Sequence, residues 1–117
     1  MGRAVFGRLE PADGTGCVAE LARFFPGAVP VRMPVQVSKG ISGIESNSEQ
    51  TVIEFGTPTE VLFVSGMPLD FDDTVRVTNL DGSLEIAAKI VAMRFHHGKM
   101  AIAARFMDDV ANWVIKA

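Results

Sequence analysis

The sequence predicts a mainly β fold, in which six antiparallel strands form a barrel or a sandwich with a short helix at each end. Apolar and polar residues alternate from Val31 to Ser38 and again from Thr74 to Thr78, as they do in half-buried strands. Asp81 and Gly82 form a dipeptide that strongly favours a hairpin turn. The other strand-like runs are short and separated by turn-forming residues, which is typical of antiparallel folds.

Two zones of the chain differ in pattern. Residues 1–29 predict an N-terminal arm of loop and short helix, and residues 30–117 predict the β domain. Within the arm, Cys17 to Phe25 carries apolar residues at helical spacing, and Pro26 ends this predicted helix.

The second zone predicts the strands in order. After Val31–Ser38, the polar segment from Lys39 to Gln50 is predicted to be a loop. The five further predicted strands are Thr51–Phe55, Glu60–Ser65, Thr74–Thr78, Leu84–Phe95 and Lys99–Met107.

The tail from Asp108 to Ile115 predicts a second short helix. Its acidic start suits the positive end of a helix dipole, and Val110, Trp113 and Val114 recur at helical spacing. We expect Trp113 to pack this closing helix on the barrel.

Composition and charge exclude several classes of function. Eleven basic residues against fourteen acidic ones give a net charge of -3, which argues against general electrostatic binding of nucleic acid. The longest stretch without a charged residue, Val61 to Leu69, is far shorter than the roughly 20 apolar residues of a membrane-spanning helix. We therefore expect no nucleic-acid partner and no membrane insertion. The first residues contain no apolar signal region, so we expect a cytoplasmic protein.

Few residues suggest a metal or cofactor. Cys17 is the single cysteine, which excludes an internal disulfide and a multi-cysteine zinc site. His96 and His97 are adjacent in a predicted turn, and neighbouring strand residues point to opposite faces, so they are not expected to chelate one ion. Residues 14–19 match the G-x-G-x-x-A pattern, but the parallel βαβ context of a dinucleotide site is missing, and a loop is the preferred interpretation.

No residue set predicts catalysis. The carboxylates Asp70, Asp72 and Asp73 cluster in one loop, and Asp108 and Asp109 in another, where solvation explains them. The prediction is therefore no enzyme, no cofactor and no metal, with an unrecognised carboxylate enzyme kept as a third hypothesis.

Four pieces of the chain, in order and spacing, resemble a PilZ domain. They are the opening strand Arg32–Val37, the segment Val61–Val77, the strand Ile86–Met93 and the last strand Ile102–Phe106, with Trp113 as a closing aromatic residue. PilZ domains are small six-stranded β-barrels, and many of them bind the second messenger cyclic di-GMP. The resemblance thus implies a barrel rather than a sandwich, and a bacterial signalling role.

The ligand motifs of the family are only partly present. Its R-x-x-x-R motif falls on Ala28 and Arg32, and its [DN]-x-S-x-x-G motif places Phe55, Thr57 and Glu60 at the three specified positions. One arginine is thus missing, an aromatic ring replaces the polar acceptor, and a carboxylate replaces the glycine. Two lost charge-assisted contacts and the added carboxylate would cost roughly 4–6 kcal/mol, or three to four decades of affinity.

Two functional predictions follow from the resemblance. The first is a PilZ-like signalling module that has lost standard cyclic di-GMP binding and acts through contacts with a protein partner. The alternative is a cyclic di-GMP receptor that uses a non-standard site made by Arg32, Thr57 and Arg23.

Overall fold

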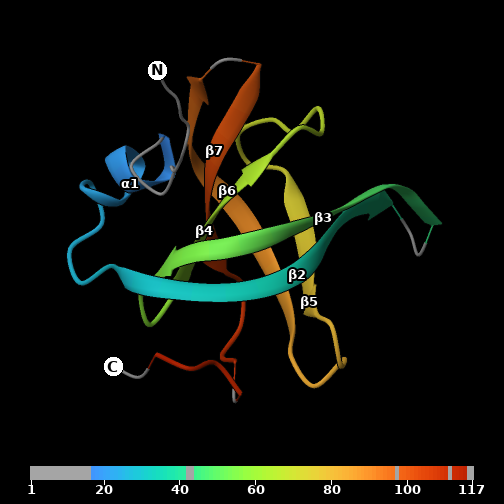
Figure 1. Ribbon diagram of the computed structural model, residues 1–117. Helices are drawn as coiled ribbons and strands as arrows, with labels where there is room; N and C mark the ends of the chain where they lie inside the picture. Colours follow the sequence, from blue (N-terminus) through green and yellow to red (C-terminus); the bar gives the residue numbers. More distant parts are fainter. Residues whose placement is uncertain (1–16, 42–43, 97, 111, 116–117) are drawn as a thin grey trace, which may run out of the picture.

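A computed structural model describes residues 17–41, 44–96, 98–110 and 112–115. One short helix, α1 (Cys17–Ala22), precedes six strands: β2 (Val29–Ile41), β3 (Ile44–Gly56), β4 (Glu60–Ser65), β5 (Thr74–Asn79), β6 (Glu85–His96) and β7 (Lys99–Phe106). The strands close into an antiparallel barrel in the order β2-β3-β4-β7-β6-β5. This confirms the predicted six-stranded barrel (Figure 1).

The barrel interior is an apolar core made by alternate residues of every strand. Period-2 alternation sends one face of each strand inward, as at Val35 and Val37 of β2 and Val75 and Val77 of β5, which are all buried. Met67, Leu69, Leu84 and Trp113 come from outside the strands and complete the same core. Loops and tail thus cover what the strands alone would leave open.

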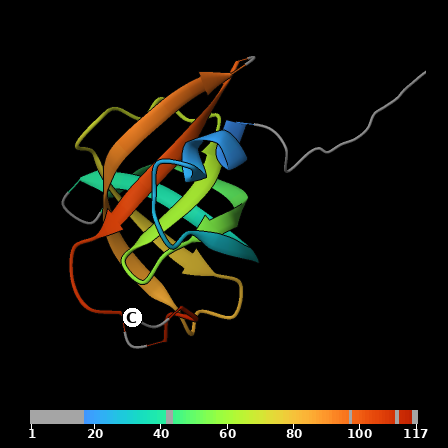
Figure 2. The same cartoon turned by 90° about the vertical axis from the view of Figure 1, so that its left-hand side faces the viewer.

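A second, smaller cluster attaches α1 to the outside of the barrel. Val18 and Leu21 of the helix pack on Leu62, Ala101 and Ala103, whose side chains point outward from β4 and β7. Central strands β4 and β7 are therefore apolar on both faces, which explains the continuous run Ala101–Ala104. Figure 2 shows α1 lying against the wall of the barrel.

Two segments in the N-terminal half of the chain differ from the sequence prediction. The helix ends at Ala22 rather than Phe25, and hydrogen-bonded turns follow it. The described residues of the segment predicted as a loop from Lys39 to Gln50 are strand. β2 and β3 pair over them, with one register shift between Lys39 and Gly40, and extend together past the barrel (Figure 1). The polar residues of this segment form a strand because ladder pairing with β2 outweighs low intrinsic strand preference.

The predicted C-terminal helix is wrong. Residues 107–110 and 112–115 form turns and bends, and they contain no helix. Two side-chain contacts hold this tail on the barrel: the Asn112 amide donates to the Ser83 carbonyl at 2.8 Å, and the Trp113 indole donates to the Thr57 carbonyl at 2.7 Å. These side-chain hydrogen bonds fix the tail on the barrel without the backbone hydrogen bonds of a helix. The expected burial of Trp113 is confirmed, since it is 2% exposed.

Candidate functional site

The turn between β3 and β4 contains Thr57 and Glu60, two of the positions that the sequence comparison with the PilZ motif singled out. Its residue Thr57 is buried, and its hydroxyl oxygen accepts hydrogen bonds from the backbone NH groups of Thr59, at 3.1 Å, and Glu60, at 2.9 Å. The backbone NH of Thr57 donates to the Glu60 carbonyl at 3.0 Å. Threonine stabilises this turn because its hydroxyl accepts hydrogen bonds from backbone NH groups that a hydrophobic side chain would leave unpaired.

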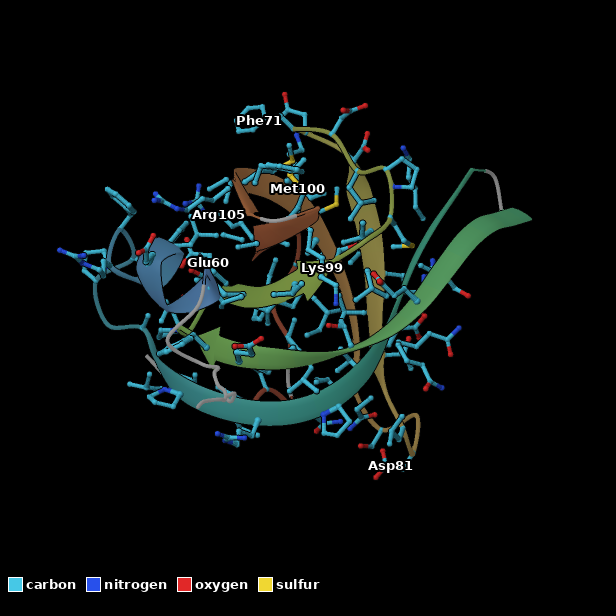
Figure 3. All side chains as sticks on the ribbon, turned by 45° about the horizontal axis from the view of Figure 1, so that its top comes forward. Glu60, Phe71, Asp81, Lys99, Met100 and Arg105 are labelled. Carbon is cyan, nitrogen blue, oxygen red and sulfur yellow. The ribbon has the colours of Figure 1, made fainter. Side chains whose placement is uncertain are left out.

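The Thr57 hydroxyl also contacts the residue at the third motif position. It donates to Oε1 of Glu60 at 2.5 Å, while Nε and one terminal nitrogen of Arg105 each lie 2.9 Å from Oε2. Glu60 and Arg105 are opposite each other on β4 and β7, so strand register places the two charges together. Figure 3 shows the Glu60 and Arg105 side chains beside each other. We call Thr57, Glu60 and Arg105 the turn triad.

The tail packs over this turn from the other side. In addition to its bond to the Thr57 carbonyl, Trp113 makes an edge-to-face contact with Phe106, with ring centroids 5.5 Å apart. A Cβ atom placed on Gly56 would lie 2.7 Å from Cζ2 of Trp113, so the indole needs glycine at that position. The turn is thus enclosed by the tail on one side and held by Arg105 on the other.

Arg32 of β2, a residue of the predicted ligand site, lies in a β-bulge. Val31 and Arg32 together oppose Glu54, because the register shifts between Pro30 and Met33. Arg32 is exposed and has a φ of 98°, a backbone conformation that arginine rarely adopts. Burial raises the pKa of the Glu54 carboxyl above its ordinary value, and the positive charge of Arg32 opposes that rise. The Arg32 guanidinium therefore lies within electrostatic reach of Glu54.

The three residues of the predicted non-standard ligand site do not form one cluster of contacts. Arg23 is exposed in the turn after α1, Arg32 interacts with Glu54, and Thr57 is buried and bonded to Glu60. Within the part of the chain that the structure describes, no hydrogen bond joins any two of these three side chains. Ala28 is half-buried, and Phe55 packs with the outer apolar cluster.

Sequence reasoning missed Arg105 and Gly56, which complete the site. Arg105 is 45 residues from Glu60 in the chain, and only the pairing register of β4 with β7 reveals the contact. The position of Gly56 directly before Thr57 was the signal that could have indicated its role. Its contact with Trp113 could not be predicted, because Trp113 lies in a tail that was predicted to be helical.

The described residues contain neither a metal-binding cluster nor a membrane-spanning helix. No group of three or more His, Cys, Asp or Glu side chains among them could hold a metal ion. None of their helices combines the length and apolar character needed to cross a membrane. The G-x-G segment at residues 14–16 and the side chains of Cys17, His96 and His97 lie outside what the structure describes.

No protein-family model matches the chain, and a search of curated proteins finds no significant match.

Proposed function

We propose that this chain is a PilZ-like signalling module that acts through contacts with a protein partner and lacks the standard cyclic di-GMP site. The turn triad is the observation that carries this proposal. The hydroxyl of Thr57 is hydrogen-bonded to Glu60, and the carboxylate of Glu60 is bonded to both Thr57 and Arg105. A ligand phosphate at this turn would meet a carboxylate and a buried hydroxyl rather than free donors.

Other features agree with a role in protein contact. Phe24, Phe71, Leu80 and Phe95 are large apolar side chains that are 61% to 70% exposed. Aromatic side chains on a surface are typical contributors to binding energy in protein interfaces. The proposal includes no catalytic activity: in the loop of clustered carboxylates, Asp73 bonds to Lys39 and to the Asp70 backbone NH. A cytoplasmic location is part of the same proposal.

The alternative, a non-standard cyclic di-GMP site, depends on Arg32. Its guanidinium is exposed, and the strained backbone at this residue is a feature found at many binding sites. Arginine offers a planar fork of donors that matches phosphate and guanine acceptors. Among the described residues, no hydrogen bond joins Arg32 to Arg23 or Thr57, the other members of this predicted site.

Titration calorimetry with cyclic di-GMP distinguishes the two proposals. We expect no heat of binding from the wild-type protein at micromolar messenger. Saturation at low micromolar messenger that is lost in Arg32→Ala but kept in Arg76→Ala would establish the alternative. Arg76 is the matched control because it is an exposed strand arginine that pairs with an exposed residue, Glu85.

A further inference from the structure

The hairpin turn between β5 and β6 contains a dipeptide that can react with itself. Asp81 and Gly82 are both exposed, and Gly82 has a φ of 76°, in the left-handed region that favours glycine. Figure 3 shows Asp81 at the tip of this hairpin, away from the body of the barrel. An aspartate followed by glycine is open to attack by its own backbone, because glycine places no side chain beside the attacking nitrogen.

The reaction is aspartate isomerisation, and it needs only the chain and water. The backbone nitrogen of Gly82 bonds to the side-chain carboxyl carbon of Asp81 and gives up its proton, and one carboxyl oxygen leaves as water. Water then opens the succinimide ring that has formed. Opening at the side-chain carbonyl restores aspartate, whereas opening at the main-chain carbonyl leaves isoaspartate, which adds one methylene to the main chain.

In the folded turn, both reacting groups have other hydrogen-bond partners. The Gly82 NH donates to the Asn79 carbonyl at 3.1 Å, and Oδ1 of Asp81 accepts from the Ser83 NH at 2.8 Å. Hydrogen bonds from the side chain and backbone of Ser83 hold the pKa of the Asp81 carboxyl below its ordinary value. The carboxyl therefore stays ionised, whereas the neutral acid is the form that loses water more readily.

Asn79 fixes this turn with its side chain as well as its backbone. Its Nδ2 donates to Oγ of Ser83 at 3.1 Å, and its Oδ1 accepts from the Leu84 NH at 3.0 Å. Asparagine side chains commonly stabilise turns by such bonds to nearby residues. Because Leu84 is buried in the core, the side chain of Asn79 ties the exposed tip of the turn to a fixed point.

We propose that Asp81-Gly82 is a site of spontaneous aspartate isomerisation, and that Asn79 slows the reaction by holding the turn in place. The reaction proceeds when the turn opens locally, and exposed turns are among the parts of a fold that open most easily. Isoaspartate would lengthen the main chain next to Ser83, whose carbonyl accepts the Asn112 bond of the tail. The damage would thus reach the contact that holds the tail. The inference does not depend on the proposed signalling function.

The first test is isotope labelling in water enriched in heavy oxygen, because each opening of the succinimide adds one labelled oxygen. Trypsin releases the peptide Val77–Lys89, in which Asp81 is the only aspartate, and mass spectrometry measures its label. The peptide should label roughly 5- to 30-fold more slowly in the folded chain than in urea, as a small cost of local opening implies. Equal rates would overturn the protection, and no label in urea would overturn the site.

The second test uses variants of the folded chain. Asn79→Ala should label faster than wild type, and Ser83→Ala, which removes only the partner of Nδ2, should act in the same direction if Asn79→Ala does not fold. Glu85→Gln is the matched control, because it breaks an exposed ion pair on the same two strands and none of the bonds of the turn. A folded variant of the first kind that labels no faster than Glu85→Gln overturns the role of Asn79.

The internal standard for these comparisons is a second Asp-Gly pair, Asp13-Gly14, which lies outside the described residues. Trypsin releases it in the peptide Leu9–Arg23, whose label should be the same in wild type and in every folded variant. If this peptide also labels faster in Asn79→Ala, the substitution has loosened the chain as a whole, and the assignment to the turn is wrong.

The third test assigns the label and its consequence to one residue. In Asp81→Glu, label in the corresponding peptide should disappear, because glutamate would have to close a larger and less favourable ring. Wild type that has been aged until it is partly labelled should unfold at lower urea than fresh protein, whereas Asp81→Glu aged in parallel should not change. Label that persists in Asp81→Glu comes from another residue, such as Asn79, and overturns the proposal.

Discussion

The indole nitrogen of Trp113 donates a 2.7 Å hydrogen bond to the backbone carbonyl of Thr57, across 56 positions of the chain. This bond joins the tail to the turn between β3 and β4, where Thr57 also holds Glu60. The tail is therefore part of the barrel's structure and closes it at the turn that carries Thr57 and Glu60. Stability and the candidate site depend on the same few contacts, and each contact can be tested.

Trp113 should contribute strongly to stability. Trp113→Ala should lower the free energy of unfolding by about 3–5 kcal/mol, as truncation of large buried aromatic residues does. Trp113→Phe should cost about 1–3 kcal/mol, because the Thr57 carbonyl loses its buried donor. Urea denaturation measures both values, and Val114→Ala, at an exposed neighbouring position, should change stability by less than about 0.5 kcal/mol. Equal stability of Trp113→Ala and wild type would mean that the tail is not docked in solution.

Gly56 should tolerate no side chain while Trp113 is present. Gly56→Ala should cost about 1–3 kcal/mol through overpacking, since the new Cβ would lie 2.7 Å from the indole. Gly66→Ala serves as the control because its Cβ would meet nothing closer than 3.4 Å. In a double-mutant cycle with Trp113→Leu, the two effects should be less than additive. Full additivity would contradict a direct clash between the two positions.

The turn triad should be more important than an exposed ion pair. Glu60→Gln should lower the free energy of unfolding by about 1.5–3 kcal/mol, because buried Glu60 accepts charged hydrogen bonds from Arg105. Glu85→Gln breaks the exposed Arg76–Glu85 pair and should cost about 1 kcal/mol or less. Chemical denaturation of the two variants gives the comparison, and an equal loss in both would show that burial adds nothing to the triad.

Acid should weaken the contact between Lys39 and Asp73. The hydrogen bond from Lys39 lowers the pKa of the Asp73 carboxyl below its ordinary value of 3.8. A depressed carboxyl pKa contributes stability that is fully present above 3.8 and is lost as the pH falls through the lower folded-state pKa. Asp73→Asn should therefore flatten the acid limb of a plot of melting temperature against pH. An unchanged acid limb would show that this carboxyl does not contribute to acid sensitivity.

Much of the barrel could be predicted from local pattern. Alternation at Val31–Ser38 and Thr74–Thr78, and the Asp81-Gly82 turn, correspond to β2, β5 and the β5–β6 connection. These predictions hold because strand periodicity and turn chemistry are local properties of the backbone. The comparison with the PilZ motif singled out positions 57 and 60 and stays a prediction, and it did not reveal the contact between Thr57 and Glu60.

Tertiary structure decided the rest. The described residues of the polar segment from Lys39 to Gln50 form strand because each strand of the hairpin provides the other's hydrogen-bond partners. The tail is not the predicted helix. Its Trp113 instead bonds to Thr57 and packs beside Gly56 and Phe106. Arg105 joined Glu60 through the register of two strands far apart in the chain. Sequence periodicity determines which face of a strand is buried, whereas only the closed barrel determines which residues from distant segments meet.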